Sequence, residues 1–81
     1  MPYFTYILKS KKNNDIYVGS CENVLIRLQR HNDGKVKSTK GYKPWDLMEY
    51  KEFNTRSEAV NHEIFLKTHQ QKDIIKKKYN K

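Results

Sequence analysis

Short stretches of apolar and aromatic residues, set between polar clusters, predict the first two β-strands of the chain. Residues Tyr3 to Leu8 are mostly aromatic or β-branched, and such residues favour strands that are buried on at least one face. A polar cluster at 11–15 interrupts this run, and a second short strand is predicted from Asp15 to Gly19. Two strands so close in sequence form an antiparallel hairpin, which would place Tyr6 and Tyr17 near one another.

A helix and a long polar loop follow the predicted hairpin. Asn23 is a suitable N-cap, Val24 to His31 is helical in composition, and the Asn-Asp-Gly sequence at 32–34 ends the helix. From Gly34 to Lys43 the chain has few apolar residues and many Lys, Ser, Thr and Gly residues, which is typical of an exposed loop. The basic residues of this loop are Lys35, Lys37, Lys40 and Lys43.

The second half of the chain predicts one strand and then a helix. Trp45 to Phe53 sets apolar residues among charged ones, as expected of a strand with a solvated side or edge. Asn54 or Thr55 caps the helix that follows, which runs to about Lys67. Glu58 lies three residues after Thr55, in the position of a capping box.

The chain of 81 residues has room for one domain, with its core expected at about 3–67 and a basic C-terminal helix or tail at 70–81. Seventeen Lys and Arg residues against nine Asp and Glu residues give a net charge of +8, which favours a polyanionic partner unless it serves only solubility. Nucleic acid is favoured over an anionic membrane surface as this partner. Membrane binding would need a long apolar run, and the longest apolar runs here are only a few residues.

The single cysteine and the N-terminal sequence bear on the compartment. Cys21 is the only cysteine, so neither an intramolecular disulfide nor a cysteine-based zinc site can form within one chain. The N-terminal residues carry no basic segment followed by a long apolar segment and a small-residue cleavage site. Both features predict a cytoplasmic protein.

Glu63 stands out because a carboxylate falls on the apolar side of the second helix. Successive residues of a helix are turned by about 100° around its axis. This rotation places Ala59, Val60, Ile64 and Leu66 in one broad stripe, with Glu63 near its centre. Burying an unpaired carboxylate is costly, so Glu63 must meet a cation, hydrogen-bond donors, a metal ion or water. A salt bridge to lysine or arginine is the ordinary alternative to a functional role.

The first helix carries Arg27 and His31 along one border of an apolar stripe formed by Val24, Leu25 and Leu28. Arginine offers planar donors for a phosphate oxygen, and histidine exchanges a proton near neutral pH. Taken singly, each is also what the border of an ordinary amphipathic helix contains.

The two tyrosines and a glycine complete the residues of interest. Tyr6 and Tyr17 on neighbouring strands are ordinarily packing residues. Gly19 directly after the second strand permits a turn or the close approach of a bound backbone. Only the combination of these residues with Arg27, His31 and Glu63 is suggestive.

The order of these residues along the chain resembles the order found in the GIY-YIG nuclease superfamily. The resemblance is in particular to its stand-alone, single-domain bacterial members, which are related to the nuclease half of the excision-repair endonuclease. The stretches that carry the resemblance are Tyr6-Ile7-Leu8, Ile16-Tyr17-Val18-Gly19, Arg27-Leu28 with His31-Asn32, Lys43-Pro44-Trp45, and Ser57-Glu58-Ala59 with Glu63. No single stretch is specific, but five in order over Tyr3 to Leu66 are a strong signal.

The resemblance implies an α+β fold, in which a small three-stranded antiparallel sheet is flanked by helices in the order β-β-α-β-α-α. It implies an endonuclease that hydrolyses phosphodiester bonds of nucleic acid with Mg²⁺ or Mn²⁺ and acts in DNA repair or recombination. DNA is expected ahead of RNA as the partner. The chain is expected to be a monomer or a weak homodimer.

The resemblance also implies roles for individual residues. Tyr6 and Tyr17 correspond to the two motif tyrosines, with Tyr17 the expected general base, alone or with His31. Arg27 is the expected phosphate contact, and Glu63 the expected metal ligand. The further residues expected to contact substrate are Gly19, Lys35, Lys37, Lys40 and Lys43.

Two departures from the family pattern leave other functions open. Phe4 stands in place of the glycine of the name motif, and Glu22 stands where the excision-repair relatives carry a lysine that Lys37 or Lys40 would have to replace. One alternative is a binding module that keeps the fold without cleaving and engages DNA or RNA through its basic loop and tail. A weaker alternative is a protein whose basic face docks onto an acidic partner protein.

Overall fold

The strands form one antiparallel sheet in the order β2-β1-β3. The computed structural model describes residues 2–80, and its strands are β1 (Tyr3–Ser10), β2 (Ile16–Cys21) and β3 (Trp45–Phe53). The most apolar strand, β1, is central and pairs on both sides, so four of its residues in a row are buried. Charged residues of β3 lie on the exposed edge strand, as predicted.

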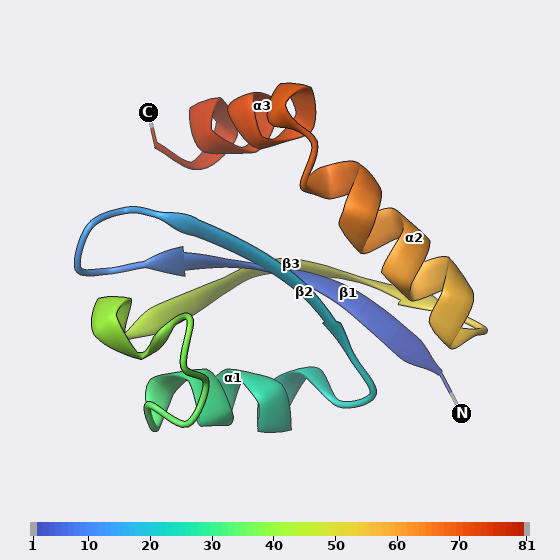
Figure 1. The fold of residues 1–81 in the computed structure, drawn as a ribbon, viewed down its shortest axis with the longest axis horizontal. Coiled ribbons are helices and arrows are strands. Elements are labelled where there is room, and N and C mark those ends of the chain that lie inside the picture. The colour runs from blue at the N-terminus through green and yellow to red at the C-terminus, as the bar shows by residue number, and fades with distance from the viewer. Residues whose placement is uncertain (1, 81) are drawn as a thin grey trace.

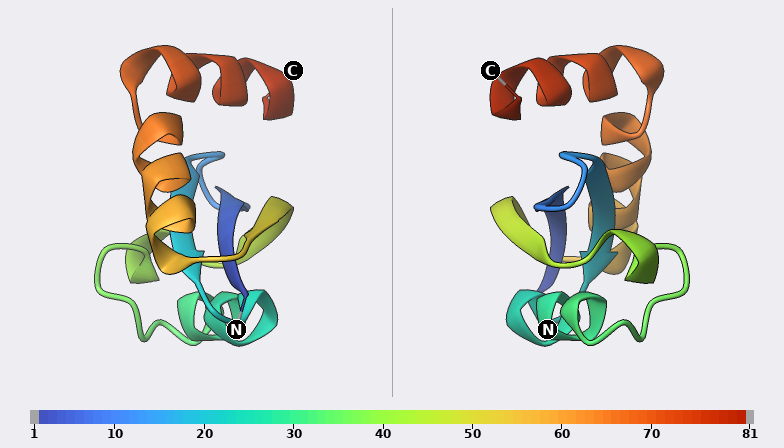
Figure 2. Two further views of the ribbon diagram at one scale, coloured as in Figure 1. Left: turned by 90° about the vertical axis from the view of Figure 1, so that its right-hand side faces the viewer. Right: turned by 90° about the vertical axis from the view of Figure 1, so that its left-hand side faces the viewer.

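Helices cover both faces of the sheet, as Figures 1 and 2 show. On one face lies α1 (Val24–Asn32), and on the other lie α2 (Arg56–Leu66) and α3 (His69–Tyr79). Successive residues of a strand point to opposite faces, so β1 contributes to two separate cores. The core on the α1 side contains Tyr6, Leu8, Cys21, Val24 and Trp45. The core on the α3 side contains Ile7, Ile16, Val18 and Ile75.

The expected α+β fold with element order β-β-α-β-α-α is confirmed. Both strands of the hairpin extend two residues beyond their predicted ends, because ladder pairing continues to Ser10 and Cys21. The long loop contains a short 3-10 helix, η1 (Lys40–Tyr42). The tail predicted at 70–81 is helical from His69 to Tyr79, and residue 81 lies outside the described residues.

The predicted helix starts are confirmed, and they orient the two helices that carry Arg27 and Glu63. Asn23 Oδ1 accepts a hydrogen bond from the Ile26 amide at 3.0 Å, and Thr55 Oγ1 accepts one from the Glu58 amide at 3.2 Å. In place of the usual return bond of a capping box, the Thr55 hydroxyl donates to the Glu58 carboxylate at 3.0 Å.

Two side chains predicted for the apolar stripes are on the outside instead. Leu25 is 73% exposed and Ile64 is 59% exposed, so placing them in the core is wrong. Each helix packs against the sheet through a narrower face than the sequence pattern suggests, since only Val24 and His31 of α1 and Ala59 of α2 are fully buried. Among residues 2–80, no helix combines the length and apolar character needed to cross a membrane.

Candidate active site at the edge of β2

Tyr6 and Gly19 face each other across the β1–β2 ladder. A Cβ atom added to Gly19 would lie 2.5 Å from the Tyr6 hydroxyl oxygen and 2.7 Å from Cζ of the same ring. The ring therefore occupies the space that a side chain at position 19 would need. Gly19, predicted to contact substrate, is buried, and the close approach that it permits in this structure is that of Tyr6.

A chain of hydrogen bonds leads from Tyr6 into the loop after α1. The Tyr6 hydroxyl lies 3.0 Å from His31 Nε2, and His31 Nδ1 lies 2.7 Å from Thr39 Oγ1. The Thr39 hydroxyl donates its proton to the Val36 carbonyl at 3.3 Å, so the proton between Thr39 and His31 belongs to Nδ1. Nε2 is then the acceptor, and the Tyr6 hydroxyl is the donor.

His31 is a buried, neutral member of this chain. Its exposed fraction is 0%, and burial lowers its pKa to about 4, with Arg27 and Arg30 acting in the same direction. Burial also raises the pKa of Tyr6 far above its usual range, with Tyr17 adding to the effect and Arg27 opposing it. Because His31 reaches no solvent, its ring nitrogens contact Tyr6 and Thr39 and not a bound molecule. Its predicted place at the border of the helix face is wrong.

Tyr17 lies beside this chain and opens toward solvent. Its ring centroid is 5.0 Å from that of His31 and 6.3 Å from that of Tyr6, as the predicted hairpin requires. The Tyr17 hydroxyl bonds to none of the residues 2–80, and no buried side-chain polar atom of these residues lacks a partner, so this hydroxyl faces solvent. Of the two motif tyrosines, Tyr17 alone can meet a bound molecule through its hydroxyl.

Glu63 lies on the opposite face of the sheet and reaches the free edge of β2, the strand that carries Tyr17. Its Oε1 accepts a hydrogen bond from the Ser20 hydroxyl at 2.6 Å, and its Oε2 lies 2.7 Å from Lys67 Nζ one turn along α2. The same ammonium lies 5.8 Å from the centroid of the Tyr17 ring. Because β2 is an edge strand, side chains from both faces meet along its free edge.

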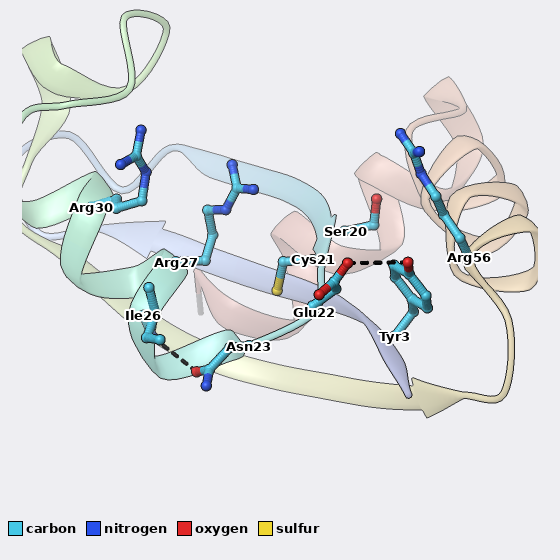
Figure 3. Close-up of a pocket in the computed structure, with 9 residues that line it drawn as sticks. All are labelled: Tyr3, Ser20, Cys21, Glu22, Asn23, Ile26, Arg27, Arg30 and Arg56. Atoms are coloured by element: carbon cyan, nitrogen blue, oxygen red, sulfur yellow. Dashed lines mark hydrogen bonds between the residues drawn. The ribbon is translucent and has the colours of Figure 1, made fainter. Parts of the chain in front are cut away.

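Arg27 lines a cleft of about 490 Å³ that begins next to Ser20, the partner of Glu63. Figure 3 shows the Arg27 side chain rising from α1 toward the end of β2. Its charge influences the pKa values of both Tyr6 and His31. A phosphate group in this cleft would find the guanidinium on one wall and Ser20 near the other.

The loop lysines lie apart from this cleft. Among residues 2–80, the cleft lining includes none of Lys35, Lys37, Lys40 and Lys43, although all four are exposed. The loop itself is tied down by the Trp45 indole, which donates to the Thr39 carbonyl at 3.0 Å, and by Ser10, which donates to the Tyr42 carbonyl at 2.5 Å. Contact of these lysines with a substrate therefore requires a molecule that extends well beyond the cleft.

Three residues of this arrangement were not singled out by the sequence. Lys67 is four residues after Glu63 on one helix, so its pairing was accessible from spacing alone. Ser20 and Gly19 are consecutive on β2 and point to opposite faces of the sheet, so Ser20 lies on the face that α2 covers. Thr39 had no local signal, because its partner His31 lies across a turn and an irregular loop.

The donors at this edge suit a hard cation that keeps most of its water. Within residues 2–80 no three acidic, His or Cys side chains gather as a metal site, but Mg²⁺ is commonly held by one or two carboxylates plus water. Glu63 is 19% exposed, and its Oε2 already faces a cation, the Lys67 ammonium. Glu63 is therefore the residue that fits such an ion, provided that Lys67 moves aside.

Comparison with known proteins found a matching family model and similar sequences. The family model described as the GIY-YIG catalytic domain matches residues 2–80. A UPF0213 protein of Staphylococcus haemolyticus is 36% identical over 91% of this chain and 90% of its own length. UPF0213 protein YazA of Bacillus subtilis is 35% identical over 96% of this chain and 82% of its own length.

A solved structure shares the fold. The solution NMR structure of a UPF0213 protein from Bacillus halodurans matches with a TM-score of 0.56 and 29% identity, over 93% of this chain and 82% of that one. The family match, these relatives and the shared fold lead to one conclusion: the chain belongs to the GIY-YIG catalytic domain family, among its small UPF0213 members.

Proposed function

We propose that this protein is a metal-dependent endonuclease that hydrolyses phosphodiester bonds of nucleic acid at the edge of β2. The observation that carries the proposal is the meeting of Tyr17 and Glu63 there, bridged by Lys67 at 2.7 Å from the carboxylate and 5.8 Å from the ring centroid. These groups come from opposite faces of the sheet, and core packing alone gives no reason for them to meet. DNA is the substrate we propose, with repair or recombination as the process.

Within this proposal each residue has a distinct task. Water attacks the phosphorus atom and the bond to the leaving oxygen breaks, and that oxygen takes a proton from solvent water. The proton of the attacking water passes to the Tyr17 oxygen, which acts as phenolate or within a relay. Arg27 binds the phosphate oxygens and offsets the charge that develops on them. His31 and Thr39 are positioning residues, because they hold the Tyr6 phenol against Gly19. Glu63 would hold Mg²⁺ or Mn²⁺, which supplies Lewis-acid stabilisation of phosphate charge.

A second function, binding without cleavage, is favoured by one observation. Both carboxylate oxygens of Glu63 are engaged, Oε1 by Ser20 and Oε2 by the Lys67 ammonium. If this ion pair persists when nucleic acid is bound, Glu63 serves the fold and the protein is a binding module. The basic surface would then confer salt-dependent affinity with little sequence preference.

Cleavage of a labelled substrate panel separates the two functions. The panel holds single-stranded, duplex, flapped and four-way DNA with RNA counterparts, each tested with Mg²⁺ and with Mn²⁺. We expect cleavage by the wild type, a loss of at least about a thousandfold in Glu63→Ala, and unchanged cleavage by Glu52→Ala, which removes an exposed carboxylate of β3. Binding throughout the panel with no product from the wild type would instead identify a binding module.

A further inference from the structure

The arginines of this chain are gathered in one place. The sequence has 17 Lys and Arg residues, of which only three are arginines, at positions 27, 30 and 56. All three line the 490 Å³ cleft beside the candidate active site, and none of the lysines within residues 2–80 does. If the surface charge served only solubility, there would be no reason for the arginines to gather in one cleft that the lysines do not line.

Two elements bring these side chains together. Arg27 and Arg30 are three residues apart on α1 and so share one side of that helix, whereas Arg56 is the first residue of α2. Figure 3 shows Arg27 and Arg30 on one side of the cleft and Arg56 on the other, with the end of β2 between them. The three guanidinium groups therefore line both sides of one cleft.

None of the three guanidinium groups forms an ion pair within the described part of the chain. The carboxylates of residues 2–80 that form ion pairs are Glu63, Asp46 and Glu49, each with a lysine. Glu22 does line the cleft, but it accepts a hydrogen bond from the Tyr3 hydroxyl at 3.1 Å and forms no ion pair with an arginine. Gathering unpaired like charges is unfavourable unless an anion joins them.

We propose that this cleft binds the sugar–phosphate backbone of the substrate strand on one side of the cut, with Arg30 and Arg56 contacting phosphates next to the one that Arg27 contacts. This inference rests on the proposed function and deepens it. Guanidinium groups form paired, planar hydrogen bonds with phosphate oxygens, which lysine cannot reproduce. The strand runs from Tyr17 and Glu63 past Arg27 toward the start of α2, so the loop lysines make weaker, outer contacts.

The test compares two double variants that remove the same charge. Binding of labelled DNA is measured by fluorescence anisotropy at several salt concentrations, with metal chelated so that no strand is cut. Arg30→Gln with Arg56→Gln is expected to weaken binding by about tenfold or more and to lower the log–log salt slope by about 2. Lys35→Gln with Lys37→Gln is expected to weaken binding several times less.

A third variant separates charge from hydrogen-bond geometry. Arg30→Lys with Arg56→Lys should keep most of the salt slope, since the charges stay, and still bind more weakly than wild type. Thermal melts accompany every variant. Because Arg30 and Arg56 are exposed, we expect melting temperatures close to that of the wild type.

Three outcomes would overturn the inference in different ways. Equal losses in the arginine and lysine pairs, with cleavage intact in the wild type, would reject the arginine cleft and leave the nuclease proposal standing. Displacement of DNA by polyglutamate as readily as by unlabelled DNA would assign the cleft to acidic protein. A wild type that neither binds nor cleaves any nucleic acid would reject the proposed function itself.

Discussion

The two faces of the sheet are both buried, yet they are built from different chemistry. Between the sheet and α1, Tyr6 and His31 pack in a core where every buried side-chain nitrogen and oxygen atom of residues 2–80 has a hydrogen-bond partner. Between the sheet and α3, the core is an aliphatic cluster that includes Ile7, Ile16 and Ile75. Hydrophobic contact is non-directional, whereas hydrogen bonds require defined distances and angles. The hydrogen-bonded α1 face therefore fixes the positions of Tyr6 and His31, whereas the aliphatic cluster under α3 contributes mainly stability.

The largest test of this contrast is Gly19→Ala on the α1 face. A methyl group there would lie 2.5 Å from the Tyr6 hydroxyl oxygen, so Tyr6 must move and its bond to His31 must weaken. We expect cleavage to fall about a hundredfold, the loss typical of a displacement near 1 Å at a reacting centre. Gly41→Ala is the matched control, because a Cβ at Gly41 meets nothing within 4 Å. Equal activity in both variants would show that Tyr6 need not be held in place.

On the opposite face, Ile75→Ala should affect stability and leave chemistry alone. Ile75 is 5% exposed and packs in the aliphatic core, so its truncation should lower the free energy of unfolding by about 2–5 kcal/mol. Cleavage measured well below the melting temperature should match the wild type. The neighbouring Ile74→Ala is the control, since Ile74 is 52% exposed. A large loss of activity in folded Ile75→Ala would mean that the two faces are coupled.

Acid should weaken the α1 face through His31. The pKa of His31 is lowered to about 4 in the folded protein, against about 6.5 in the unfolded chain, so the unfolded state binds more protons between these values. The resulting stability is fully present above pH 6.5 and falls by about 3 kcal/mol as the pH drops to about 4. Denaturant melts across this range, compared with His31→Gln, isolate the contribution. A difference between the two proteins that does not change with pH would contradict a buried neutral imidazole.

The smallest expected effect is that of Thr39→Val, which keeps the shape of the side chain and removes the acceptor for His31 Nδ1. Leaving a buried N–H unpaired should lower the free energy of unfolding by about 1–3 kcal/mol. His31, the partner of Tyr6, is then no longer held by Thr39. Cleavage should therefore fall by about tenfold or less, and the pH profile of cleavage should change. Thr39→Ser should restore both, and failure of this rescue would place Thr39 outside the hydrogen-bond chain.

Local sequence determined the elements of this protein. Residue alternation, caps and turn residues act over a few positions, which is why both helix starts and all three strands were predicted close to their observed places. The helix faces were predicted less well, since the side of a short helix that meets the sheet depends on the packing partner. Leu25 and Ile64 are apolar and yet exposed for this reason.

The sequence by itself also determined which side chains with chemical potential exist and where each stands along the chain, including Glu63 as an out-of-place carboxylate. Only the tertiary structure decided which of them meet. Ser20 and Glu63 are 43 residues apart, and Arg56 joins Arg27 only because α2 begins beside the end of β2. Such meetings depend on the order of strands in the sheet and on how the helices pack against it, and no short-range pattern encodes either.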